Sequence, residues 1–202
     1  MFPLGSVLFP HGVLPLHVFE QRYQQLLNQA LETDRKFGVV LISRGSEVGG
    51  GEIRNNIGTV AVIEDHQRFD DGRAAVVSTG AQRLEVVDWL PDDPFPRAMV
   101  RELAPEPAVN DDAVLLARVQ QTFHDLISLG QRLGRLEQTP DATWADDLEQ
   151  ATWQLAGRAP CTALDQYSVL AAPTRASRLQ KIDQLLKDVA ADLEMMGRLD
   201  DN

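Results

Sequence analysis

The sequence has 202 residues, 44% of them hydrophobic, and a formal net charge of −11. This length suits one large domain or two small ones, and the negative charge opposes general binding to nucleic-acid phosphates. No apolar run approaches the ~20 residues that span a bilayer, no signal peptide is apparent, and the single cysteine, Cys161, excludes an internal disulfide. We therefore expect a cytoplasmic protein that binds neither a membrane nor a nucleic acid.

Residues 12–31 change their apolar period half-way, which predicts a strand that runs into a helix. Residues 13–19 form an apolar extended run, and because Pro15 cannot donate to a sheet ladder, we expect an edge or a bulge there. We expect Leu16 and Phe19 to lie in the core, and His17, between apolar neighbours, to be buried in a structural role. The following apolar positions form the stripe of an amphipathic helix: Tyr23, Leu26, Leu27, Ala30 and Leu31.

Short strands separated by turn signals fill the rest of the first half. The candidates are residues 7–9, 37–42, 57–63, 74–78, 84–90 and 97–103. Asp70, Asp71 and Gly72 are typical of a hairpin turn, and residues 43–56, with three glycines in succession, suggest a polar loop. Several short strands at this spacing indicate a curled sheet or a small barrel.

The second half has a helical pattern. Pro105 and Pro107 suggest a linker, so we divide the chain into a β-rich subdomain, residues 1–104, and a helical subdomain, residues 105–202. Asn110 can cap the first helix, and a capping box at Thr143 and Asp146 predicts another that ends near Gly157. Residues 162–171 form a short helix between prolines.

The two longest helices carry the clearest apolar stripes. The first stripe is Leu115, Val119, Phe123, Leu126, Ile127 and Leu133. The last helix has Leu179, Ile182, Leu186, Val189, Leu193 and Met196. Because these last positions alternate in steps of three and four, they predict a two-helix seam.

The opening of the chain resembles the Lon N-terminal domain, the substrate-binding module of the Lon protease. The matching positions are Phe9, Pro10, Gly12, Leu14, Pro15, Leu16, Phe19, Glu20, Arg22 and Tyr23. Gln21 departs from the family pattern, which usually has proline there, and Leu84 replaces an aromatic residue in a later turn motif. The resemblance implies an α+β fold, in which a PUA-like β-barrel precedes a helical bundle with a long last helix.

Catalytic motifs of the Lon protease are not found in the sequence. No glycine precedes a lysine, so there is no phosphate-binding loop, and only Lys36, Lys181 and Lys187 could serve a Ser-Lys dyad. The four histidines are scattered, and the acidic doublets lie in turns or first helical turns, where carboxylates accept local N–H bonds. We therefore expect no enzymatic activity, no metal site and no cofactor.

Three aromatic residues lie in or beside turn-rich polar sequence and are candidate anchors for an apolar polypeptide: Phe69, Trp89 and Phe95. We expect at least two of them to line one concave surface. The alternative is that they fold back and close the ends of the barrel.

The leading hypothesis is a non-catalytic polypeptide-binding module, a free-standing relative of the Lon substrate-binding domain. It would recognise unfolded or degron-bearing proteins as an adaptor or scaffold, with an ATP-dependent protease as a candidate partner. A PUA-like module for small molecules or RNA and an uncharacterised hydrolase are the alternatives. The oligomeric state is open.

Overall fold

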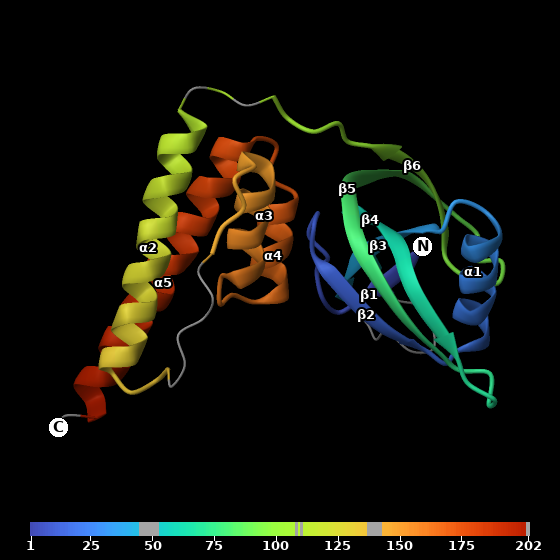
Figure 1. Ribbon diagram of the computed structural model, residues 1–202, viewed down its shortest axis with the longest axis horizontal. Helices are drawn as coiled ribbons and strands as arrows, with labels where there is room; N and C mark the ends of the chain where they lie inside the picture. Colours follow the sequence, from blue (N-terminus) through green and yellow to red (C-terminus); the bar gives the residue numbers. More distant parts are fainter. Residues whose placement is uncertain (45–52, 108, 110, 137–142, 201–202) are drawn as a thin grey trace. The chain divides into compact units, whose positions relative to one another are not determined.

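The computed structural model describes residues 1–44, 53–107, 109, 111–136 and 143–200. The chain divides into two compact units, Met1–Pro105 and Glu106–Asn202. The first holds the sheet and one helix, and the second holds the other helices (Figure 1). Two sequence predictions, the glycine run at residues 49–51 and the cap at Asn110, lie outside the described residues.

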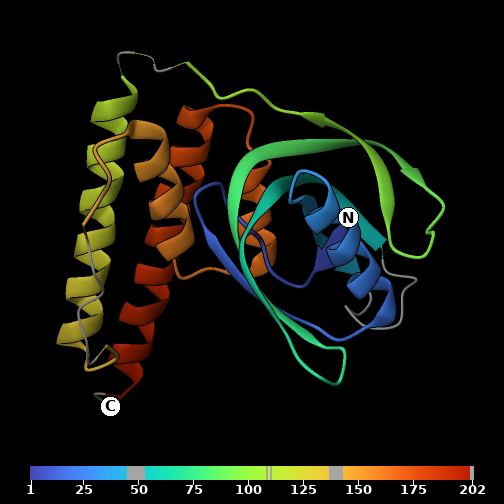
Figure 2. The same cartoon turned by 45° about the vertical axis from the view of Figure 1, so that its right-hand side comes forward.

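One curled sheet contains all the strands of the described residues (Figure 2). The strands are β1 (Phe2–Leu4), β2 (Val13–Val18), β3 (Lys36–Arg44), β4 (Ile53–Arg68), β5 (Ala74–Leu90) and β6 (Arg97–Glu102). Their order is β1-β3-β4-β5-β2, and β6 pairs with the second half of β5. Only β1 and β3 are parallel. The α+β class predicted from the sequence is confirmed, with the sheet curled as expected.

The two faces of the sheet carry separate apolar clusters. In β3, Val39 belongs to the larger cluster and Val40 to the smaller one, and both side chains are almost completely buried. Because successive side chains of a strand point to opposite faces, this double coverage explains the uninterrupted apolar run of residues 37–42.

Helix α1 (Gln21–Glu32) packs on the larger cluster. Its predicted apolar stripe is confirmed, since Tyr23, Leu26, Leu27 and Ala30 are buried. The Tyr23 ring stacks on Phe2 of β1 with 4.1 Å between centroids and an interplanar angle of 11°. Helix α1 therefore packs against both β1 and the buried face of the sheet.

The strand predicted at residues 7–9 is wrong, because the first strand is β1 instead. Leu8 and Phe9 are nevertheless buried. Their carbonyl groups find other partners, since Thr59 Oγ1 donates to Leu8 O at 2.5 Å and the Gly12 N–H donates to Phe9 O at 3.0 Å. A Cβ atom on Gly80 would lie 2.2 Å from Phe9 O, so only glycine permits β5 to pass this segment.

Two further strand boundaries differ from the sequence predictions. The segments 74–78 and 84–90 form one continuous strand, β5, although polar residues separate them. The strand continues because its other side keeps pairing, first with β2 and then with β6. Residues 53–56, expected in a polar loop, begin β4.

The helical unit contains α2 (Asp112–Arg132), α3 (Leu148–Arg158), α4 (Ala163–Leu170) and α5 (Arg175–Asp200) in its described part. Helices α2 and α5 lie side by side and run in the same direction (Figure 1). The residues buried between the helices of this unit include Leu116, Val119, Phe123 and Leu126 from α2, and Leu179, Ile182 and Leu186 from α5. The predicted seam is confirmed at its start, but Val189 and Leu193 are only half-buried and Met196 is 49% exposed.

The capping box predicted for Thr143 and Asp146 is wrong. Helix α3 begins after Asp147, whose carboxylate accepts a hydrogen bond from the Gln150 N–H at 2.7 Å. Either member of the Asp pair could have capped the helix from sequence alone, and the second one does. A capping box of the same residue types forms at Thr162, at the start of α4.

A buried ionic cluster fastens the start of α5 to the start of α2. Arg175 Nη1 donates to Asp112 Oδ2 at 2.8 Å, and both side chains are only 4% exposed. Arg178, with a side chain 2% exposed, donates to Glu106 Oε1 at 2.9 Å, and its guanidinium lies 4.0 Å from the centroid of the Trp153 ring. Arg175 Nη2 also donates to the Glu106 carbonyl at 3.0 Å. The charges are therefore both paired and desolvated.

Candidate functional site

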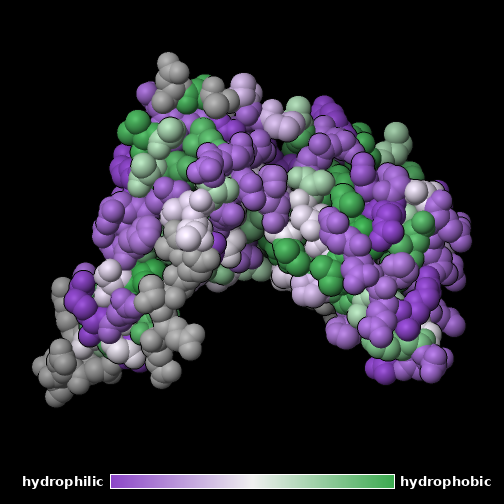
Figure 3. Space-filling view, viewed as in Figure 1, coloured by the Kyte–Doolittle hydropathy of each residue, from purple (hydrophilic) through white to green (hydrophobic). Residues whose placement is uncertain are grey.

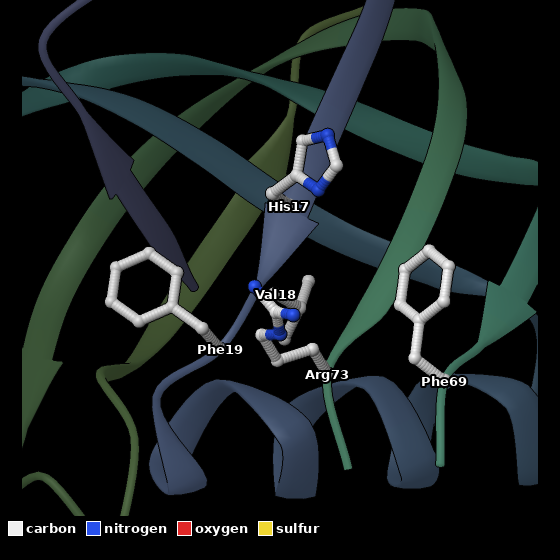
Figure 4. A pocket seen from close by; sticks show the side chains of 5 residues that line it. All are labelled: His17, Val18, Phe19, Phe69 and Arg73. Atoms are coloured by element: carbon white, nitrogen blue, oxygen red, sulfur yellow. The ribbon is translucent and has the colours of Figure 1, made fainter. Parts of the chain in front are cut away.

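A cavity of about 310 Å³ opens beside the end of β2. It is lined by His17, Val18, Phe19, Phe69 and Arg73 (Figure 4). Figure 4 shows the rings of Phe19 and Phe69 on opposite sides, with Arg73 and Val18 between them. The two aromatic side chains therefore form the walls of the cavity.

The end of strand β2 and the residue after it supply His17, Val18 and Phe19 to this cavity. Leu14, Leu16 and Val18 point inward and Val13, Pro15 and His17 outward, as the alternating burial of the strand records. Phe19 continues the outward series and is 54% exposed. The predicted core position of Phe19 and the predicted burial of His17 are therefore wrong, whereas Leu16 is half-buried and packs on the main cluster.

The hairpin between β4 and β5 supplies the other wall. The Phe69 N–H donates to Arg73 O at 2.9 Å, and the Gly72 N–H donates to Phe69 O at 3.0 Å. Gly72 has a φ of +86°, which glycine adopts without strain. The predicted turn is thus confirmed, and it leaves the Phe69 side chain 39% exposed beside β2.

The charge in the cavity is compensated locally. The Arg73 guanidinium donates to Asp71 Oδ2 at 2.6 Å. This hydrogen bond lowers the pKa of the Asp71 carboxyl and raises the pKa of Arg73, so both groups stay ionised as a pair. The paired Arg73 and Asp71 together add no net charge to the cavity. A ligand therefore needs no carboxylate to neutralise the arginine.

A second cavity, of about 160 Å³, shares His17, Val18 and Phe19 with the first. It also reaches Phe2 and Leu4 of β1. The outward side of β2 adds exposed apolar area, because Val13 is 68% exposed and Val77, which pairs with Pro15, is 41% exposed. Figure 3 shows hydrophobic residues interspersed with hydrophilic ones on the surface of the sheet unit.

The other two aromatic residues singled out in the sequence lie elsewhere. Trp89 is half-buried on the smaller apolar cluster, where its Nε1 donates to Asn56 Oδ1 at 3.3 Å and the Arg54 guanidinium lies 4.9 Å from its ring centroid. Phe95 packs on the larger cluster and lines a separate cavity of about 220 Å³. The structure thus places Phe69, Trp89 and Phe95 in three different surroundings.

Phe19 is the residue of this site that the sequence prediction missed. A signal was present, because His17 is the one ionisable residue in the run 13–19. A polar side chain in an otherwise apolar strand marks the solvent face, and by alternation Phe19 belongs to the same face.

Other chemistry is limited in the described residues. No group of three or more His, Cys, Asp or Glu side chains is arranged to hold a metal ion there. Burial and the nearby Asp165 carboxylate raise the pKa of the Cys161 thiol, which lowers its thiolate population and its reactivity. None of the described helices is long and apolar enough to cross a membrane.

Comparisons with known proteins agree on one family. The model of the ATP-dependent protease La (LON) substrate-binding domain matches residues 1–188. Lon protease 2 of Herpetosiphon aurantiacus is 30% identical over 105 residues, which are 51% of this chain and 13% of that protein. The chain spans between 13% and 25% of the length of such curated relatives.

Two solved structures share the fold. One is a crystal structure of a Lon N-terminal domain protein from Xanthomonas campestris, with 24% identity, a TM-score of 0.64 and coverage of 90% of this chain and 94% of that one. The other is the N-terminal domain of the Mycobacterium avium complex Lon protease, with 17% identity, a TM-score of 0.66 and coverage of 92% and 97%. Because the family model covers nearly the whole chain, this protein belongs to the Lon substrate-binding domain family.

Proposed function

We propose that this chain is a non-catalytic module that binds apolar segments of unfolded or degron-bearing polypeptides at the cavity between Phe19 and Phe69. The observation that carries the proposal is the exposure of two aromatic side chains, 54% and 39%, on opposite walls of one cavity. Large aromatic side chains in such positions are the usual anchors of protein interfaces. Their exposure costs the folded protein apolar burial, which a bound polypeptide would restore.

The surroundings of the cavity support the same ligand class. The Arg73 charge is paired with Asp71, and the exposed neighbours Val13 of β2 and Val77 of β5 are apolar. Because the chain carries a net charge of −11, an uncharged or basic polypeptide approaches it more readily than an acidic one. The same charge makes RNA the weaker of the candidate ligands.

Binding of fluorescein-labelled unfolded casein tests the proposal by fluorescence anisotropy, at an ionic strength of about 0.3 M that screens the repulsion between two acidic chains. Phe19→Ala and Phe69→Ala should each weaken binding by ~1–2 kcal/mol, about 5- to 30-fold, the cost of removing an interface anchor. Both variants should keep their melting temperature, since the side chains are substantially exposed. Val87→Ala is the matched control, because Val87 is 63% exposed but pairs with neither β2 nor the β4–β5 hairpin tip.

Trp89→Ala and Phe95→Ala separate the aromatic residues by role. Both side chains pack on apolar clusters, so we expect lower stability and little specific loss of casein affinity. Unchanged casein affinity in both Phe19→Ala and Phe69→Ala would refute the proposed site. Casein cleavage or ATP hydrolysis by the purified chain, lost on a single substitution, would refute the non-catalytic role.

The finer part of the proposal is an adaptor or scaffold role beside an ATP-dependent protease. Its test is the rate at which the host's ATP-dependent protease degrades casein with and without this chain. An adaptor should raise the rate, and Phe69→Ala should remove the increase. No change in rate would leave casein binding in place and overturn the adaptor role.

A further inference from the structure

One edge of β2 offers backbone hydrogen-bonding groups. Within the described residues, β2 is hydrogen-bonded to β5 alone and lies at the end of the sheet order. The Gly80 N–H donates to Gly12 O at 2.8 Å. Because hydrogen-bonded and non-hydrogen-bonded pairs alternate along an antiparallel ladder, the next pair, Val13 and Thr79, is a non-hydrogen-bonded one. By alternation, Val13, Pro15 and His17 direct their backbone groups away from β5.

This register explains why proline is tolerated at this place. Pro15 is one of the residues that face away from β5, so its missing N–H removes no bond of the ladder. The edge therefore presents the N–H and C=O of His17, the C=O of Pro15 and the backbone groups of Val13. An extended chain pairs with such an edge, which is why exposed edges are recognition surfaces.

Cavities lie next to this edge at its His17 end. The 310 Å³ cavity lies towards Phe69 and the 160 Å³ cavity towards Phe2 and Leu4 of β1, and both are lined by His17, Val18 and Phe19. Successive side chains of a strand point to opposite faces. A strand paired with the edge at His17 would thus direct one side chain into the 160 Å³ cavity and the next towards Phe19, the near wall of the 310 Å³ cavity.

We propose that the bound polypeptide segment adds as an extended strand to the free edge of β2, with one apolar side chain in the 160 Å³ cavity and the next against Phe19. This inference rests on the proposed function and specifies its substrate class: uncharged or basic segments with apolar residues at neighbouring positions. An amphipathic helix is a poor substrate, because its apolar residues recur every three or four positions and its backbone groups are already bonded.

Alternating N-methylation of a bound peptide tests this mode. The probe is the acetylated and amidated peptide Lys-Ser-Val-Phe-Ile-Val-Ser-Lys, measured by isothermal titration at low salt against the full chain. A single N-methyl group at each internal residue in turn removes one N–H and keeps the side chains. Because alternate N–H groups of a strand face its partner, affinity should fall about tenfold at every second position and change little between them.

Each result is decisive. Loss at alternate positions supports strand addition. Binding that no N-methyl group weakens, or that all weaken equally, overturns strand addition, although loss of that binding in Phe69→Ala would still support the proposed function. A peptide that does not bind in its unmethylated form, together with casein that does not bind, refutes both.

A protein variant tests the same hydrogen bond from the other side. His17→Pro removes the outward N–H, and His17→Ala removes the imidazole but keeps that N–H. Both variants lack the same side chain, so their difference reports the backbone group. His17→Pro should bind the peptide about tenfold more weakly than His17→Ala. Equal affinities of two folded variants contradict strand addition, and if His17→Pro does not fold, the N-methylated peptides decide.

Discussion

Asp112→Ala should destabilise the helical unit by about 3 kcal/mol, the low end of the cost of breaking a buried ion pair, because Arg175 loses its nearest carboxylate but keeps Glu149 at 4.0 Å. The carboxylate accepts hydrogen bonds from Arg175 Nη1 at 2.8 Å and from the Val109 N–H at 3.2 Å. With both side chains 4% exposed, water cannot replace the lost partner. For an m-value of ~1.5 kcal/mol per M, the urea midpoint should fall by ~2 M.

The assay is tryptophan fluorescence in a Trp89→Phe background, in which Trp144 and Trp153 report on the helical unit alone. Asp111→Ala is the matched control, because Asp111 is exposed and makes no capping side-chain hydrogen bond with the described residues. It should cost no more than ~1 kcal/mol. A shift of the same size in both variants would refute the reasoning.

Three further predictions concern the sheet unit and α2. Gly80→Ala should lower the unfolding free energy of the sheet unit by ~1–3 kcal/mol or more, because the added Cβ would meet Phe9 O at 2.2 Å. Gly130→Ala in α2 should raise stability by up to ~1 kcal/mol, because the added Cβ makes only an ordinary contact, at 3.5 Å from Leu136 Cβ. Thermal melts measure both changes. Burial lowers the pKa of the Met1 amino group from 8.0 to about 5. Between these values the unfolded chain binds a proton that the folded chain does not, so stability should rise from pH 5 to pH 8, and acetylation of the amine should abolish that slope in urea titrations.

The sequence predicts best those elements whose surroundings are uniform. Residues 37–42 are apolar at every position because both faces of β3 are covered, and no face needs to be assigned. The stripe of α1 and the first half of the α5 stripe are equally clear, since each helix buries one face. In these cases local pattern and tertiary packing agree.

Strand β2 shows where a single sequence is insufficient. Its run of apolar residues resembles that of β3, yet only its inner side is covered. Apolar residues on an open outer face break the rule that links hydrophobicity to burial. The sequence therefore assigns Phe19 to the core for the same reason that this residue is proposed to bind a polypeptide. Its side chain is apolar but lies on a surface outside the core.

The positions of the aromatic residues depend on contacts between distant parts of the chain. Trp89 is held by Asn56 and Arg54, more than thirty positions earlier in the sequence. Phe95 lies beside Met1 and Phe37. Loop-like sequence around these residues correctly indicates a break after β5, but it carries no information on which distant partner covers each ring.

The common direction of α2 and α5 has a consequence for how the helical unit folds. Asp112 meets Arg175 and Thr122 meets Asp183, pairs separated by 63 and 61 positions in the chain. Helices that follow one another through a short loop run antiparallel and can pair as soon as both exist. Here the chain must first return through α3 and α4, so the entropy of closing a long loop precedes the central contact. The longest helix, which completes this pair, can therefore dock only after most of the unit has been synthesised.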